Sequence, residues 1–220
     1  MWTSRAVTWA FLVAAAGPAW AGDLTGIVRF LGTAPPTAVI ETTKDRAVCG
    51  PSVEDESLLV SDGRLANVVV VVKGGPTPAP AKVTLDQRRC RYHPHVQAAP
   101  AGSTLEILNG DELLHSVHGW AGHATRFDVV TPSKGIRAAT KLDRPGLIQV
   151  RCDVHGWMRA YIMVADGPAA VTGPDGTFTI RDLPAGSYVL AVWHERLGEK
   201  TAQISVPARG TVRADLDFGG

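Results

Sequence analysis

The sequence predicts an all-β protein, and three observations support this fold class. Short runs rich in Val, Ile, Leu and Thr recur along the chain, and Gly, Pro, Asn or Asp separates nearly all of them. The 220 residues include 23 Gly and 15 Pro, which favours frequent turns. No long segment has the helical period, and the only candidate for even a short helical turn is HERLGEK at residues 194–200.

The N-terminal residues 1–21 have the pattern of a cleaved secretory signal. One positive charge, Arg5, precedes an apolar run at 6–16, and Ala19-Trp20-Ala21 ends the segment. We therefore expect cleavage after Ala21 and export to an oxidising compartment such as the periplasm. No later run approaches the ~18 apolar residues of a membrane span, so none is expected after cleavage.

The remaining chain, residues 22–220, has a balanced charge. The whole sequence has 22 Lys and Arg against 21 Asp and Glu, and the signal contains one Arg and no acidic residue. The formal net charge therefore falls from +1 to 0 when the signal is removed. This balance gives no indication of nucleic-acid binding.

The expected strands follow one another at short intervals after the signal. In the run 176–183, Phe178 and Ile180 share one face while Thr177 and Thr179 share the other, which is typical of a half-buried antiparallel strand. A series of such runs with turns between them indicates a β-sandwich architecture. The runs lie at 24–32, 65–74, 81–86, 103–111, 125–132, 146–152, 159–166, 176–183, 186–195, 201–207 and 211–218.

Three cysteines are present, and in an oxidising compartment two of them are expected to pair. Cys49 and Cys90 lie in polar, turn-rich surroundings, and a disulfide between them would stabilise the fold by about 2 to 4 kcal/mol. We favour this pairing. The sequence leaves the other pairings open, and they would deprive the loop at Cys152 of its thiolate.

The loop Cys152-x-x-His155-x-x-Met158 has the side chains of a metal site. A thiolate, an imidazole and a thioether, completed by a second imidazole, form the trigonal set with a weak axial Met that holds copper in electron-transfer proteins. His115, which follows an apolar run and a polar turn, is the candidate for the second imidazole. The alternative is that these are ordinary core residues, because a lone C-x-x-H is a weak signal.

Zinc is the main competing metal, since one Cys and two His also suit a tetrahedral zinc site. A Met ligand contributes little to zinc and favours copper. A binuclear copper centre would need a second cysteine beside Cys152, and the sequence has none there.

The stretch from 81 to 166 carries further motifs in a recognisable order. They are Tyr92-x-Pro94, Gly102-Ser103-Thr104-Leu105, Asn109-x-Asp111, His115-x-Val117 and Cys152-x-x-His155-x-x-Met158. In this order the stretch resembles the cupredoxins, the blue copper family of plastocyanin, pseudoazurin and amicyanin. The resemblance implies a Greek-key β-sandwich. One departure is Ser116, where the family more often has an Asn that braces the cysteine loop.

The cupredoxin resemblance also implies the site and its chemistry. It implies one copper ion per chain, held by His115, Cys152, His155 and Met158, that carries single electrons. His155 would lie near the surface as the port for electrons. The partners would be redox proteins such as a periplasmic dehydrogenase or cytochrome.

A second resemblance covers the two ends of the chain. The pattern Asp175-Gly176-x-Phe178-x-Ile180 followed by Leu183-Pro184-x-Gly186-x-Tyr188 resembles the carboxypeptidase regulatory-like, transthyretin-like sandwich. Matching pieces lie on both sides of the cupredoxin stretch, which implies a second, discontinuous sandwich. The expected order is a signal peptide at 1–21, the first part of this sandwich at 22–79, the copper domain at 80–166 and the second part at 167–220.

Other histidines and tryptophans have less specific surroundings. The sequence leaves open whether His93, His95 or His118 touches a metal. His194, at the end of a strand, is expected to pack or to form a surface ion pair. The remaining residues to be placed are His123, expected in an exposed loop, and Trp120 and Trp157, which either shield a metal from water or pack in a core.

We expect an electron carrier and not an enzyme, because no nucleophile–base pair or pair of carboxylates stands out as catalytic. Two alternatives belong to other classes. A copper storage or delivery protein would use additional histidines. A carbohydrate or cell-surface binding module would need an exposed aromatic platform, for which Trp193 is the candidate.

Overall fold

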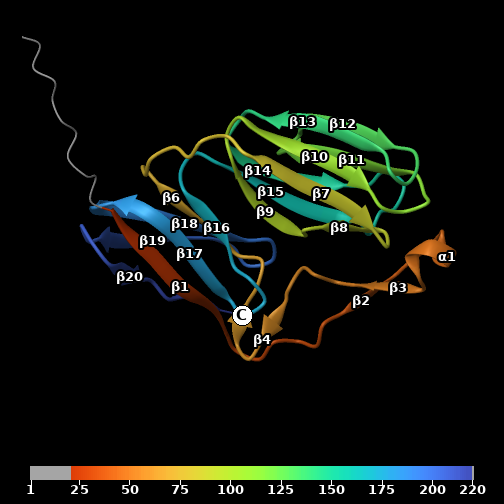
Figure 1. Ribbon diagram of the computed structural model, residues 1–220. Coiled ribbons are helices and arrows are strands. Elements are labelled where there is room, and N and C mark those ends of the chain that lie inside the picture. Colours follow the sequence, from red (N-terminus) through yellow and green to blue (C-terminus); the bar gives the residue numbers. More distant parts are fainter. Residues whose placement is uncertain (1–20, 220) are drawn as a thin grey trace, which may run out of the picture.

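The computed structural model describes residues 21–219, and nearly all of its regular structure is β, as predicted (Figure 1). The one helix among these residues is α1, Arg46–Cys49. The predicted signal lies outside the described residues except for Ala21, which pairs with Pro184. Within 21–219, no helix is long and apolar enough to cross a membrane.

The strands cover most of the predicted runs and several segments between them. Their bounds are β1 (Ala21–Leu31), β2 (Val39–Glu41), β3 (Ser52–Glu54), β4 (Val60–Ser61), β5 (Arg64–Leu65), β6 (Val69–Lys73), β7 (Lys82–Arg88), β8 (Arg91–His93), β9 (Val96–Pro100), β10 (Ser103–Asn109), β11 (His115–Ala121), β12 (Ala124–Thr131), β13 (Arg137–Leu142), β14 (Gly146–Arg151), β15 (Arg159–Ala165), β16 (Ala169–Val171), β17 (Thr177–Pro184), β18 (Gly186–His194), β19 (Gly198–Val206), β20 (Thr211–Arg213) and β21 (Leu216–Gly219). The segment HERLGEK comprises the last residue of β18, the turn at 195–197 and the start of β19, and contains no helix.

The middle of the chain forms one sandwich, which we call the middle sandwich. Its sheets have the strand orders β13-β10-β7-β8 and β12-β11-β14-β15-β9. Alternate residues of β10 are buried, as expected for a strand with one face on a core. Leu105 and Ile107 from the first sheet share this core with Val117 and Ile162 from the second.

The two ends of the chain together form the other sandwich, which we call the terminal sandwich. One sheet has the order β17-β1-β5-β4, with β20 and β21 parallel to β1, and the other has the order β16-β6-β18-β19. The Asp175-Gly176 turn leads into β17. Gly176 has a φ of +69°, and a Cβ there would lie 2.8 Å from the carbonyl oxygen of Val28, so the turn requires glycine.

An apolar contact joins the two sandwiches and explains the unbroken run of five valines at 68–72. Val70 and Val72 face the core of the terminal sandwich, while Val69 and Val71 face the middle sandwich. A strand buried on both faces does not alternate between apolar and polar residues. Tyr161 packs on Trp193 across this contact, with the ring centroids 5.1 Å apart.

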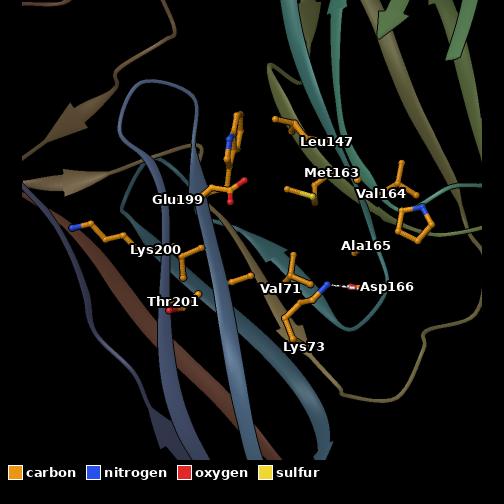
Figure 2. A pocket seen from close by; sticks show the side chains of 15 residues that line it. Val71, Lys73, Leu147, Met163, Val164, Ala165, Asp166, Glu199, Lys200 and Thr201 are labelled. Carbon is orange, nitrogen blue, oxygen red and sulfur yellow. Dashed lines mark hydrogen bonds and ion pairs between the residues drawn. The ribbon is translucent and has the colours of Figure 1, made fainter. Parts of the chain in front are cut away.

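Polar groups also join the sandwiches. His95 forms an ion pair with Glu195, and the two side chains are only 5% and 3% exposed. Beside this contact is a cavity of about 580 Å³ whose wall includes Val71 and Met163, with the Lys73–Asp166 ion pair at one side (Figure 2). None of the predicted copper ligands lines this cavity.

One segment belongs to neither sandwich. β2 and β3 pair as a hairpin with α1 at its tip, and we call this segment, Val39–Glu54, the arm. The arm leaves the terminal sandwich and runs to the far end of the middle sandwich (Figure 1). The expected Cys49–Cys90 disulfide is present and fastens α1 to the start of β8. The sequence analysis did not predict the arm.

Candidate metal centre

The two ligand segments meet because their strands are neighbours. β11 begins at His115, and β14, its antiparallel partner, ends at Arg151, immediately before Cys152. The start of one strand and the end of the other therefore lie at the same end of the sheet. The loop after β14 closes on itself through a 2.9 Å hydrogen bond from the N–H of Met158 to the carbonyl of His155.

Three donor atoms face one another at this end of the sandwich. The Nδ1 atoms of His115 and His155 are 3.0 Å apart, and the Sγ atom of Cys152 lies 4.0 Å and 3.8 Å from them, respectively. A point in their plane about 2.0 Å from both nitrogens is about 2.3 Å from the sulfur, which matches metal–ligand bond lengths at zinc. A transition-metal ion of this size therefore fits with little movement of the side chains.

All three side chains are removed from water. His115 and His155 are 0% exposed and Cys152 is 3% exposed. Met158 is 1% exposed and belongs to the same core cluster as Cys152. The structure thus brings the four predicted residues to one end of the middle sandwich.

A carboxylate fixes the outer nitrogen of each imidazole. The Nε2 atom of His115 lies 3.0 Å from Asp111, and the Nε2 atom of His155 lies 2.9 Å from Asp45. A carboxylate only accepts hydrogen bonds, so each Nε2 carries a hydrogen, and the Nδ1 of the neutral ring is the nitrogen that would bind a metal. Two such nitrogens and a sulfur at these distances favour a cation between them.

The pKa shifts of Cys152 and His115 also favour a positive charge between the donor atoms. Burial raises the pKa of Cys152, but hydrogen bonds from His115 and from the N–H of Ser116 outweigh it and bring the pKa to about 6. Burial lowers the pKa of His115, but the hydrogen bonds to Asp111 and Cys152 outweigh it and bring the pKa to about 9. A metal ion held here would bind the thiolate of Cys152 and take the place of the proton on Nδ1 of His115.

Ser116 ties the cysteine loop to β11. Its N–H lies 3.4 Å from the sulfur of Cys152, and its hydroxyl oxygen accepts a 2.8 Å hydrogen bond from the N–H of Asp153. The carbonyl of Ser116 in turn accepts a hydrogen bond from the hydroxyl of Tyr92. Ser116, the residue at which the sequence departs from the resemblance, therefore braces the cysteine loop itself.

The other candidate histidines do not join the cluster of donors. His95 is occupied by Glu195, and neither His93 nor His95 belongs to a group of ligand atoms close enough to hold a metal within residues 21–219. His118 stacks on Trp120 with the ring centroids 3.6 Å apart and bonds to Asp153. With Asp128 and Asp153 it forms a separate, largely exposed group.

Three further side chains are placed by the structure. His123 is exposed in the turn after β11, as expected. His194 is 1% exposed, so of the two roles expected for it the structure shows packing and not a surface ion pair. Trp193 is 8% exposed and lies between the sandwiches, so it offers no aromatic platform for a carbohydrate.

The expectation that His155 lies near the surface is wrong. Asp45, at the tip of the arm, covers its outer nitrogen. The ring of Trp157 lies 5.1 Å from that of His155, and its indole N–H donates to the carbonyl of Cys90. Asp45 is the site residue that the sequence analysis missed. The one available signal was the pairing of Cys49, which brings residue 45 close to the middle sandwich.

Comparison with known proteins gives likenesses to solved structures alone. No protein-family model and no curated protein matches the chain. A purple cupredoxin from Nitrosopumilus maritimus is 17% identical over 37% of this chain and 98% of its own, with a TM-score of 0.33. Amicyanin from Paracoccus versutus is 21% identical over 43% of this chain and 96% of its own, with a TM-score of 0.35.

A copper-containing nitrite reductase from Thermus scotoductus is also 21% identical, over 49% of this chain and 25% of its own, with a TM-score of 0.33. Each of these three likenesses covers less than half of this chain.

Proposed function

We propose that this chain is an exported blue copper protein that carries single electrons. The observation that supports it is the triangle of buried donors formed by Nδ1 of His115, Nδ1 of His155 and Sγ of Cys152, whose centre fits one transition-metal ion. The buried thioether of Met158 would supply the fourth donor. The copper domain comprises residues 80–166, and the transthyretin-like domain comprises 22–79 and 167–220.

The donor set favours copper over zinc. A structural zinc site uses four strong nitrogen, sulfur or oxygen donors, whereas within residues 21–219 the group around Cys152 has three, His115, Cys152 and His155. Asp111 and Asp45 are the nearest carboxylates to the two imidazoles, and both are engaged by the outer nitrogens. The buried thioether of Met158 is a soft donor that suits copper in a trigonal site.

The protein's part in electron transfer is to hold the donors still. Copper, when bound, supplies the one-electron change between its two oxidation states. Asp111 and Asp45 fix the imidazole rings, and Ser116 fixes the cysteine loop. Donors held in this way by hydrogen bonds and a dry core rearrange little when the charge at the centre changes, which favours rapid transfer.

The proposed setting is the periplasm, after cleavage of the signal following Ala21. The partners are redox proteins, such as a periplasmic dehydrogenase or cytochrome, and no substrate is transformed on this chain. The carbohydrate-binding alternative loses its candidate platform because Trp193 is buried. A copper storage or delivery protein would bind additional ions, and metal stoichiometry distinguishes this alternative.

The test is the visible absorption spectrum of the oxidised protein with one equivalent of Cu(II). We expect an intense thiolate-to-copper charge-transfer band that is absent from Cys152→Ser. Met163→Leu, which changes a methionine lining the cavity between the sandwiches, should keep the band, whereas Met158→Leu should shift it. A colourless native protein, or a colour that survives in Cys152→Ser, would refute the proposal, and binding of several ions would favour storage.

A further inference from the structure

The arm, which belongs to neither sandwich, covers the candidate metal centre of the middle sandwich. Asp45 Oδ2 lies 2.9 Å from Nε2 of His155. The imidazole is 0% exposed, whereas the carboxylate side chain is 40% exposed. Asp45 therefore stands between the Nε2 atom of His155 and the solvent, and the ring of Trp157 packs beside the imidazole.

The backbone conformation at Asp45 accompanies its contact with His155. Asp45 occupies the position before α1, where an aspartate normally accepts a hydrogen bond from the helix, but its side chain makes no such bond. Its φ of 53° and ψ of 33° place it in the left-handed region, which few non-glycine residues adopt. The carboxylate is turned towards His155 instead of towards its own helix.

The Cys49–Cys90 disulfide fastens the arm over the site. The ion pairs at the base of the arm, such as Arg91 with Glu54 at 3.8 Å, are long and partly exposed, so they hold it weakly. The two cysteines are 5% and 0% exposed. Their sulfurs and a ring nitrogen of His155 lie within 4.8 Å of one another, so the covalent fastening is adjacent to the metal centre.

We propose that the arm is a lid, locked by the Cys49–Cys90 disulfide, that controls access to the metal centre from the His155 side. Asp45 is its positioning residue, because it holds the ring of His155 with Nδ1 turned inward. This inference rests on the proposed function where it concerns copper. The covering of His155 by the arm does not depend on a bound metal.

Unlocking requires a dithiol reductant. Two electrons and two protons pass from the dithiol to the Cys49–Cys90 disulfide, which becomes two thiols while the dithiol becomes a disulfide. The tip of the arm is then held only by noncovalent contacts. Loading and removal of the metal occur through the opened side, and the locked form retains the metal and excludes small ligands from His155.

The first experiment uses the metal-free protein, so it does not depend on copper. Cys152 is the only free thiol, and the measurement is its rate of alkylation by iodoacetamide. We expect alkylation at least tenfold faster in Cys49→Ser/Cys90→Ser and several-fold faster in Asp45→Ala. Glu41→Ala removes a carboxylate of the same arm whose side chain is 86% exposed, and it should leave the rate unchanged.

General loosening of the fold is controlled by Leu190→Ala, a truncation in the core of the terminal sandwich. It should lower stability without accelerating alkylation of Cys152. Equal rates in the native protein and Cys49→Ser/Cys90→Ser would overturn the lid. Acceleration in that double variant without any in Asp45→Ala would overturn the role given to Asp45.

The second experiment measures transfer of Cu(II) from the loaded protein to EDTA, followed by loss of the visible band. We expect transfer at least tenfold faster in Cys49→Ser/Cys90→Ser than in the native protein, and equal transfer would overturn control of the metal by the lid. If no copper binds, the proposed function is refuted, but the alkylation rates still show whether the arm acts as a lid. The two failures are therefore distinguishable.

Discussion

His194 is a buried histidine whose neutral form the fold requires, and it makes the stability of the protein dependent on pH. Its Nδ1 atom accepts a hydrogen bond of 3.3 Å from the N–H of Arg196, and its Nε2 atom has no partner among the described residues. Burial lowers its pKa from 6.5 to about 4, although Glu195 acts to raise it. The unfolded chain therefore takes up a proton at His194 at pH values where the folded protein does not.

The sign follows from this difference in bound protons. The contribution of the neutral His194 to the free energy of unfolding is fully present above pH 6.5. It is lost progressively as the pH is lowered towards 4. At about 1.4 kcal/mol per pH unit, the loss between pH 7.5 and pH 4.5 is about 2.5 kcal/mol. Urea unfolding at both pH values measures it, with His194→Leu as the variant that cannot titrate. The reasoning is refuted if His194→Leu loses as much stability as the native protein.

Three further predictions concern other parts of the structure. Ser116→Ala should lower copper affinity about tenfold in a competition titration while Ser116→Asn keeps it, because the loop loses its brace; equal affinities would contradict this. Glu195→Ala leaves His95 buried without its partner and should lower the free energy of unfolding by about 3 kcal/mol in urea, and a loss below about 1 kcal/mol would contradict it. Gly176→Ala places a Cβ in a positive-φ position against the carbonyl of Val28, so it should lower the free energy of unfolding by about 2 kcal/mol in thermal unfolding. Gly74→Ala also has a positive φ but open space around the new Cβ, so it should lower the free energy of unfolding by only about 1 kcal/mol. A larger loss in Gly74→Ala than in Gly176→Ala would contradict the predicted clash.

Local sequence patterns sufficed to predict much of the fold and to name three polar side chains that the structure brings together, His115, Cys152 and His155. The alternation of Phe178 and Ile180 with polar neighbours predicted a strand with one buried face, and both are 4% exposed. The spacing of Cys152, His155 and Met158 was informative because one short loop carries three donors. These features depend on neighbours in the chain, which a sequence shows directly.

Features set by the path of the chain through space could not be predicted in this way. The arm is made of two three-residue strands and one helical turn, too short for any period to be visible. Nothing in the residues around Asp45 indicates that its carboxylate reaches a histidine 110 positions later. The burial of Trp193 likewise results from docking of the sandwiches, which places Tyr161 against it.

The middle sandwich does not contain all the groups that surround its candidate metal centre. A fragment limited to residues 80–166 would lack Asp45, so Nε2 of His155 would face solvent, and Cys90 would carry a free thiol close to His155. It would also lack Glu195, the partner of the buried His95. The arm therefore contributes a carboxylate to the candidate metal centre, and the terminal sandwich contributes another to the interface. If copper affinity were compared between such a fragment and the whole chain, the loss of Asp45, the loss of Glu195 and the loss of the lid would all change it together. Single substitutions in the intact protein change one of these features at a time.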